Sequence, residues 1–228
     1  MSDILEIIKT RRSVRKYKSD MVPADIIDKI VEPYFGENMY ILIDEETKKC
    51  AVVDPGGASD KILTYLKKNS LELEYILLTH GHGDHIGAVN YIKSKTNATI
   101  VAHSDEKELL NDNRKNLSYS MHCGPQELNA DVYVNDKDKL ELGNLKLSFI
   151  HTPGHTKGSM CIRVNDDMFT GDTLFAGSIG RTDFYSGDYK QIEKSLKKLA
   201  KFENKVKIHP GHGPSSTLGI EKMSNPYM

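Results

Sequence analysis

The segment THGHGDH, residues 79–85, places four potential metal ligands within six positions of the chain. They are His80, His82, Asp84 and His85. Neutral imidazole nitrogens together with a carboxylate are donors that zinc and iron both accept. The glycines between them carry no side chain and permit the tight backbone turns that direct successive side chains to one point. We therefore interpret this segment as part of a metal site rather than as a polar loop.

Three later segments have the same form, an apolar run followed by a possible ligand and by glycine or proline. They are HTPGHTKGS, FTGDTLF and IHPGHGP, which contribute His155, Asp172 and His212. If these loops converge on one sheet edge with the first segment, the chain supplies seven donors. Seven donors are too many for one four-coordinate zinc and suit two divalent ions that share a carboxylate. Such a site favours metal-assisted hydrolysis of a carbonyl or a related ester.

The elements that must position these residues alternate between strand and helix, which predicts a layered α/β protein. Runs of β-branched and apolar residues predict strands at 39–44, 50–57, 74–80, 98–103 and 205–213, and hairpins at 139–154 and 159–172. Helical periodicity predicts helices at 58–70, 86–96 and 189–202. Two sheet-forming halves with helices outside suggest a four-layer αββα sandwich, whereas strand order does not follow from periodicity. The first four ligands then lie just past a buried strand, where open α/β sheets bind ligands.

Composition indicates a globular protein without electrostatic bias. Of its 228 residues, 38% are hydrophobic and 28% are charged, with 31 basic against 32 acidic side chains. This balance argues against nucleic acid and against an anionic membrane surface as partners. No apolar run reaches the roughly 18 residues that span a bilayer, and we expect a cytoplasmic protein. The three cysteines are too few and too scattered for a disulfide framework.

From about residue 34 onward, the sequence resembles the metallo-β-lactamase superfamily. THGHGDH matches the family signature His-x-His-x-Asp-His, and His155, Asp172 and His212 match its later ligand positions in order. The resemblance implies the αββα sandwich of that family and two divalent metal ions, zinc first, with iron or manganese also compatible. It assigns one ion to His80, His82 and His155, the second ion to Asp84, His85 and His212, and the bridging position to Asp172.

The resemblance also implies the reaction. A water held between two divalent cations loses a proton near neutral pH, so a bridging hydroxide would attack the substrate carbonyl. Asp84 is the catalytic group expected to orient this hydroxide. His151 and His209 fall outside the ligand pattern, and we expect hydrogen-bonding or structural roles for them. His103 and His122 have no motif around them and receive no role.

Within the superfamily, the segments YFGENMY, DPGG, HTPGHTKGS and GSIGRTDF look most like small glyoxalase II-like proteins, the hydroxyacylglutathione hydrolases. This likeness implies a small-molecule thioester substrate. Only sixteen residues follow His212, without the helical domain by which longer enzymes of that group bind glutathione, so the thiol carrier stays open. β-Lactam turnover is not expected, because enzymes that open β-lactams usually carry a cysteine where Asp172 stands. Arg181 is expected either to bind a substrate carboxylate or to brace its loop through an acid such as Asp183.

Two other functions stay open from the sequence. Persulfide dioxygenases resemble glyoxalase II and hold a single iron with two histidines and an aspartate, here His80, His155 and Asp172. The second ligand set is also complete, which favours the binuclear hydrolase. A non-enzymatic binding module is disfavoured, because every ligand position of the family is filled.

Residues 1–33 form a separate segment in this interpretation, and the hydrolase domain is placed at 34–228. The N-terminal segment resembles the opening of nitroreductase-family flavoproteins, in which a basic run grips the FMN phosphate. The matching residues are Arg11, Arg12, Ser13 and Arg15. Spacing alone predicts a short helical segment, with an amphipathic helix, a basic turn and a second helix that begins at Pro23. The rest of a flavin-binding domain is missing, so a working flavin site is not expected.

Overall fold

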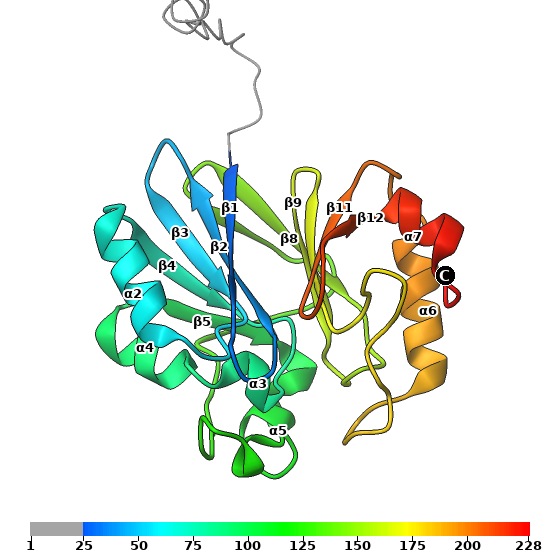
Figure 1. The fold of residues 1–228 in the computed structure, drawn as a ribbon, viewed down its shortest axis with the longest axis horizontal. Helices are drawn as coiled ribbons and strands as arrows, with labels where there is room; N and C mark the ends of the chain where they lie inside the picture. The colour runs from blue at the N-terminus through cyan, green and yellow to red at the C-terminus, as the bar shows by residue number, and fades with distance from the viewer. Residues whose placement is uncertain (1–24) are drawn as a thin grey trace, which may run out of the picture.

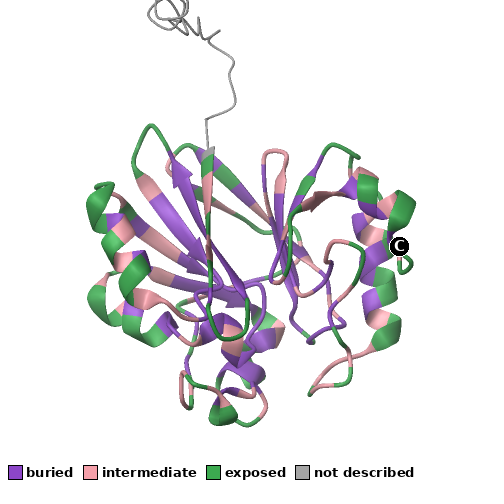
Figure 2. Ribbon diagram, viewed as in Figure 1, coloured by how far each residue is buried: buried purple, intermediate pink, exposed green. Residues whose placement is uncertain are grey.

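The structure is a computed structural model that describes residues 25–228. These residues form two six-stranded sheets that pack face to face, with helices on both outer sides (Figure 1). This arrangement is the expected four-layer αββα sandwich. In Figure 2 the strands are largely buried, whereas the outward sides of the helices are exposed.

The first sheet has the strand order β1-β2-β3-β4-β5-β6. Its strands are β1 (Asp25–Val31), β2 (Asn38–Asp44), β3 (Lys49–Val53), β4 (Glu72–Leu77), β5 (Thr99–His103) and β6 (Val132–Val134). The first three strands are antiparallel, and β3 to β6 are parallel. Parallel neighbours need crossover connections, which contain α2 (Ser59–Lys68), α3 (Gly83–Ile86), α4 (Val89–Lys95), η1 (Ser104–Glu106), α5 (Lys107–Leu110) and η2 (Ser118–Ser120).

The second sheet has the strand order β12-β11-β10-β9-β8-β7. Its strands are β7 (Lys139–Leu142), β8 (Leu145–His151), β9 (Met160–Val164), β10 (Asp167–Gly171), β11 (Lys207–Pro210) and β12 (Ser216–Thr217). All neighbours are antiparallel except β10 and β11, which are parallel. Helix α6 (Tyr189–Leu199) connects these two, and α7 (Leu218–Ser224) follows β12. Both predicted hairpins are present in this sheet.

Alternation along β2 explains why a sheet can be covered on both faces. Met39, Ile41 and Ile43 pack in the cluster with the apolar faces of α2 and α4. Tyr40 and Leu42 point to the other face and pack against the second sheet. Because successive side chains of a strand point to opposite faces, a strand that is apolar at every position belongs in the middle of such a sandwich.

The N-terminal edge of the first sheet corrects the sequence interpretation. We expected a helix from Pro23, but Asp25–Val31 form β1, which pairs with β2 from Asp25 opposite Asp44 to Val31 opposite Asn38. The sandwich therefore includes residues ahead of the boundary placed at 34. The spacing of the apolar residues in DIIDKIV does not separate a helix from an edge strand, and pairing with β2 decides between them.

Some expectations fall on residues outside the described range. These are the first predicted helix and the nitroreductase-like residues Arg11, Arg12, Ser13 and Arg15. Within residues 25–228, no helix combines the length and the apolar character needed to cross a membrane.

Candidate metal centre

The seven predicted ligands lie in segments that follow strands of both sheets. His80 comes three residues after β4, His82 precedes α3, and Asp84 and His85 lie within that helix. From the second sheet, His155 follows β8, and Asp172 and His212 follow β10 and β11. The structure brings all seven together, as two groups of three residues with Asp172 between them.

The first group contains His80, His82 and His155, whose nitrogens lie within 4.8 Å of one another. Nε2 of His155 is 2.9 Å from Nδ1 of His82 and 3.2 Å from Nε2 of His80. All three residues are at most 3% exposed. Three buried imidazoles with converging nitrogens form a ready three-histidine ligand set.

The second group contains Asp84, His85 and His212. Oδ2 of Asp84 is 3.3 Å from Nε2 of His212 and 3.8 Å from Nε2 of His85. Asp172 lies between the two groups. Its Oδ1 is 3.4 Å from Nε2 of His85, and its Oδ2 is 3.6 Å from Nε2 of His155. A single carboxylate thus reaches a nitrogen of each group.

Burial and charge give the histidines different protonation preferences. Burial, together with the neighbouring His155, lowers the pKa of His82 to about 3. Burial also lowers the pKa of His80 and of His155. For His85, burial alone would lower the pKa, but the carboxylates of Asp172 and Asp84 outweigh it and raise the pKa well above its usual value. The first group is therefore neutral and ready to bind a cation, whereas a cation at the second group displaces a proton.

Unpaired buried atoms test whether this donor set fits metal ions. Nε2 of His85 and Oδ1 of Asp172, which lie 3.4 Å apart, are buried without a hydrogen-bond partner. Buried polar atoms are normally paired, so these two neighbouring orphans need a partner. Space is also reserved here, because a Cβ on Gly211 would lie 2.3 Å from Oδ1 of Asp172. The residues present fit a pair of divalent ions.

Asp54 orients ligands from the first sheet, a role that the sequence interpretation missed. Its Oδ2 is 3.1 Å from Nδ1 of His85, and its carboxylate accepts hydrogen bonds from the backbone N–H and the hydroxyl of Thr79. The Thr79 hydroxyl is in turn 3.2 Å from Nδ1 of His80. A carboxylate behind a ligating histidine fixes its ring and raises its basicity.

Glu37 is a second buried acid that the sequence interpretation missed. It is fully buried, neither carboxylate oxygen has a hydrogen-bond partner, and Oε1 lies 4.0 Å from Nδ1 of His85. Burial raises the pKa of Glu37 well above its usual value. The pattern DPGG suggested only a turn at Asp54, and Glu37 belonged only to the family-like segment YFGENMY, so neither acid had a motif of its own.

Glu106 joins the two ligand loops. Its carboxylate accepts hydrogen bonds from the backbone N–H of Gly81 at 3.1 Å and of Gly158 at 2.8 Å, and from the hydroxyl of Thr156. Gly81 lies between His80 and His82, and Thr156 follows His155. This buried side chain therefore holds the loop after β4 against the loop after β8. The sequence offered no signal for it, because the contact spans fifty residues.

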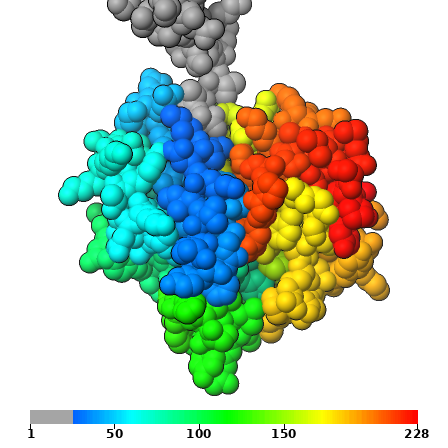
Figure 3. All heavy atoms as spheres, viewed as in Figure 1, coloured from blue at the N-terminus to red at the C-terminus, as the bar shows by residue number. Residues whose placement is uncertain are grey.

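The start of β2 supports the loop that carries His212. The backbone N–H of Asn38 donates to the carbonyl of Gly211 at 2.7 Å, and its side-chain amide donates to the carbonyls of Pro210 and Gly213. The hydroxyl of Tyr40 also donates to Pro210. Figure 3 shows the corresponding blue and orange segments in contact on the same face of the molecule. The second metal group thus depends on contacts between the two sheets.

The remaining histidines and Arg181 lie outside the two groups. Nε2 of His209 is 2.7 Å from Asp167, and Nε2 of His151 is 2.9 Å from the carbonyl of Lys157, in agreement with structural roles. His151 also stacks on His103 with ring centroids 3.9 Å apart. The exposed Arg181 side chain forms a bidentate ion pair with Asp183. Bracing of its own loop was one of the two roles expected for Arg181. Its backbone carbonyl lies 2.7 Å from Nδ1 of His155, a contact that the sequence could not reveal.

Comparisons with known proteins agree with this geometry. A family model described as "Metallo-beta-lactamase superfamily" matches residues 34–212. The Haemophilus influenzae protein named hydroxyacylglutathione hydrolase GloC is 32% identical over 203 residues, which cover 85% of this chain and 93% of the relative.

Three solved structures share the fold over similar fractions of this chain. BLEG-1, titled a B3 metallo-beta-lactamase, has a TM-score of 0.82 and 33% identity, and the match covers 89% of this chain and 99% of BLEG-1. TTHA1623, solved in a di-iron-bound form, has a TM-score of 0.79 and 29% identity over 88% of this chain and all of its own chain, 100%. ETHE1 from Myxococcus xanthus has a TM-score of 0.74 and 28% identity, with coverages of 88% and 83%.

Proposed function

The chain belongs to the metallo-beta-lactamase superfamily, and we propose that it is a binuclear metal-dependent hydrolase of small hydroxyacyl thioesters. The observation that carries this proposal is the position of Asp172 between the two ligand groups. Its two oxygens lie 3.4 Å from His85 and 3.6 Å from His155. A carboxylate that reaches both groups suits two ions, with His80, His82 and His155 around one and Asp84, His85 and His212 around the other.

Two divalent cations at these groups would supply a lowered pKa for a bound water and polarisation of the substrate carbonyl. The protein supplies the orientation. Burial alone would raise the pKa of Asp84, but His85 and His212 outweigh it and lower the pKa, so the carboxylate stays ionised near neutral pH. An ionised, partly exposed carboxylate beside the second group can accept a hydrogen bond from an attacking water and fix its direction.

A thioester suits this site because its leaving group needs little help. The thiolate is a stable anion, so the reaction does not depend on a general acid, and we identify none among the described residues of the centre. The name of the H. influenzae relative supports the same substrate class. Because the chain is also similar to a protein titled a metallo-beta-lactamase, a β-lactam must be included in any test.

The first experiment compares substrates on metal-loaded protein. We expect hydrolysis of lactoylglutathione with a weak Michaelis constant and negligible turnover of a cephalosporin. The weak constant follows from the ion pair that already occupies Arg181, because a substrate carboxylate would have to compete with Asp183. Rapid cephalosporin turnover, or no thioesterase activity at full metal occupancy, would contradict the proposal.

The second experiment tests the role of Asp84. Asp84→Ala should lower kcat by orders of magnitude while the sandwich still folds, because it removes a ligand and the orienting carboxylate together. The matched control is His151→Ala, which lies outside both groups and should change kcat far less. Equal losses in both variants with metal retained would show that Asp84 has no special role.

A mononuclear iron persulfide dioxygenase is the second candidate. His80, His155 and Asp172 are mutually close, and the chain is similar to ETHE1 from M. xanthus. The complete second group favours the hydrolase. One iron per chain and oxygen consumption on a persulfide, without thioester hydrolysis, would reverse this choice.

A further inference from the structure

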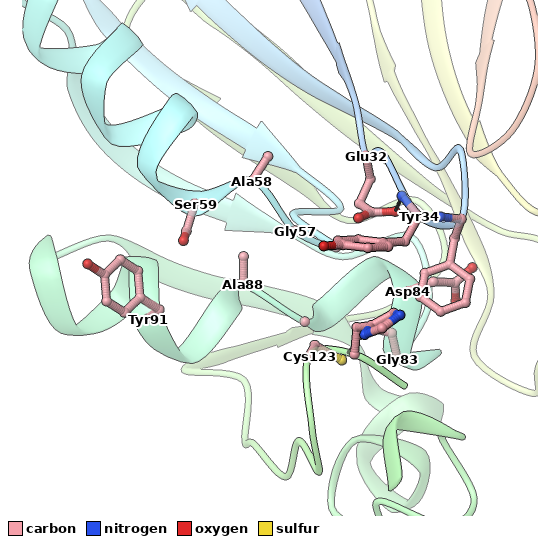
Figure 4. Close-up of a pocket in the computed structure, with 14 residues that line it drawn as sticks. Glu32, Tyr34, Gly57, Ala58, Ser59, Gly83, Asp84, Ala88, Tyr91 and Cys123 are labelled. Carbon is pink, nitrogen blue, oxygen red and sulfur yellow. Dashed lines mark hydrogen bonds between the residues drawn. The ribbon is translucent and has the colours of Figure 1, made fainter. Parts of the chain in front are cut away.

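A groove extends from Asp84 away from the centre, between the loop after β1 and the segments around α2, α3 and α4. Asp84 lies at one end, Tyr91 lies at the other, and Gly57 and Ala88 lie between them (Figure 4). The cavity volume is about 220 Å³. Asp84 belongs to the second ligand group and also lines the groove, so the groove begins beside that group.

Aromatic and small side chains make up most of this groove. Tyr34, Phe35 and Tyr91 are 68%, 43% and 45% exposed, which leaves aromatic surface available to a ligand. The ring of Tyr34 contacts His122, with centroids 4.4 Å apart, so the two loops meet over the groove. Burial raises the pKa of the Cys123 thiol, which therefore contributes a neutral, weakly polar surface.

The backbone forms a close floor in which larger residues would not fit. A Cβ on Gly57 would lie 2.8 Å from the side chain of Glu32, and a Cβ on Gly87 would lie 2.7 Å from that of Cys123. These glycines therefore permit the close approach of Glu32 and Cys123 to the backbone that makes the groove narrow. Its volume corresponds to roughly seven waters at about 30 Å³ each, which is room for a short unbranched chain.

The charges around the groove disfavour an anionic ligand. Among the described residues that line it, none is Lys or Arg. Glu32 lines the groove, and its carboxylate accepts backbone N–H groups of Tyr34 and Phe35. At the far end, Asp60 accepts a hydrogen bond from the Tyr91 hydroxyl at 3.4 Å. Lys95 contacts the Tyr91 ring but is not a lining residue.

We propose that this groove binds the acyl chain of the thioester, so that the protein accepts small hydroxyacyl groups such as lactoyl but prefers uncharged acyl groups with a longer apolar chain. The proposal rests on the thioesterase function argued above. The acyl group is the part that fits, because the groove is too small and too acidic for a carboxylate-bearing peptide carrier such as glutathione. The carrier then extends away from the groove toward solvent.

The first test varies the acyl group on one small neutral thiol, N-acetylcysteamine. From acetyl to butanoyl to hexanoyl thioesters, kcat/KM should rise, by up to about fourfold per buried methylene. The succinyl thioester, similar in length to the butanoyl one but charged, should be at least tenfold poorer than the butanoyl thioester. Equal kcat/KM across the neutral series, or a succinyl thioester as good as the butanoyl one, would overturn the proposal.

A variant then locates the effect. Tyr91→Ala removes the aromatic wall at the far end, so it should lower kcat/KM for the hexanoyl thioester about tenfold and leave the acetyl thioester unchanged. The matched control is Tyr189→Ala, on α6, a tyrosine of similar exposure that does not line the groove. Equal effects of Tyr91→Ala on both thioesters would show that the groove does not hold the acyl chain.

Direct binding separates this proposal from the proposed function. Ketone analogues, in which a methylene replaces the thioester sulfur, are titrated calorimetrically into metal-loaded protein. Affinity should increase with acyl length and fall in Tyr91→Ala. If no thioester is hydrolysed but this pattern appears, the thioesterase function is wrong and the groove assignment stands. If thioesters are hydrolysed but the pattern is absent, the groove assignment is wrong.

Discussion

Glu106 shows how one buried carboxylate can control a centre that it does not enter. It accepts backbone N–H groups from both ligand loops and the hydroxyl of Thr156. The carboxylate of Glu106 lies beside Gly81 and Gly158, and a Cβ on Gly158 would lie 2.5 Å from the Glu106 backbone nitrogen. Gly81 and Gly158 therefore let the two loops approach Glu106 more closely than residues with a side chain would.

The first prediction concerns metal affinity. Above pH 7, where Glu106 is ionised even though burial raises its pKa to about 7, Glu106→Gln keeps the shape of the side chain but replaces one accepting oxygen with an NH₂ group that faces a backbone donor. We expect the affinity for divalent metal to fall about 10- to 100-fold, as for other residues that position metal ligands through hydrogen bonds without binding the metal themselves. The control is Glu108→Gln on the same segment, which removes only exposed contacts to Lys115 and Tyr185. Competition with a chelator measures the metal affinity of each variant. Equal affinities in the two variants would show that Glu106 does not hold the two ligand loops in place.

The second prediction concerns pH. Burial raises the pKa of Glu106 to about 7 from its ordinary 4.5. The folded protein therefore holds a proton that the unfolded chain has lost between these pH values. Its contribution to the free energy of unfolding is complete below pH 4.5 and is lost as the pH rises through 7. In denaturation experiments on metal-free protein, the free energy of unfolding of the wild type should fall relative to that of Glu106→Gln as the pH rises from 4.5 to 7. The expected relative loss is up to about 3 kcal/mol. A pH-independent difference would show that this pKa is ordinary.

At the residue scale, the sequence predicted which candidate ligands lie close together in the structure, but not the residues that support them. His80, His82, Asp84 and His85 lie within six consecutive residues, so their pattern is visible locally. Asp54 and Glu106 act on loops 25 residues or more away. Their role exists only once the strands are paired, and a single acid in a sequence carries no sign of it.

At the element scale, α6 packs directly against the loop that carries His155. Gly154 has φ +138°, a conformation that favours glycine, and a Cβ there would lie 2.3 Å from the backbone nitrogen of Ile192 in α6. The backbone carbonyl of Gly154 also accepts from the N–H of Asp188, whose side chain caps the helix. The position of His155 is thus tied to the start of a helix in the outer layer.

The third prediction follows from this contact. Gly154→Ala should destabilise the fold by about 1 to 3 kcal/mol through the forced shift against α6, and it should weaken metal binding because His155 is the next residue. Gly177→Ala is the control, since φ is +74° there but nothing lies within 4 Å of the added Cβ. Urea denaturation and metal titration would compare the two. Equal losses would mean that backbone strain alone, rather than the contact with α6, sets the cost.

Element prediction succeeded where the apolar pattern was long and failed at edges. β2, α2 and α6 carry clear periodicity and are present as expected. β6 and β12 have three and two residues, too few to show a period. β1 was expected to be helical, because its paired isoleucines fit a helix as well as a strand until β2 is placed beside them.

At the scale of the whole molecule, the two sheets meet at the metal centre. His80, His82, Asp84 and His85 come from the first sheet, whereas His155, Asp172 and His212 come from the second. Each ligand group contains residues from both sheets. Metal ions bound there would therefore link the two halves of the sandwich as well as supply chemistry.

The last prediction follows from that link. Wild-type protein should bind close to two equivalents of zinc, and a ligand that binds only the folded state at 100 times its Kd adds about 2.7 kcal/mol of stability. For a chain of this length, that is roughly 5 to 10 °C in Tm, which a chelator should remove and added zinc restore. His212→Ala should bind one equivalent and lose part of this gain. His209→Ala, three residues earlier but paired with Asp167 outside the centre, should still bind two. Elemental analysis and thermal unfolding measure both quantities. If zinc binding to the wild type reached a plateau at one equivalent, the hypothesis of a second site would be wrong. If chelation left the Tm unchanged, bound metal would not stabilise the packing of the two sheets.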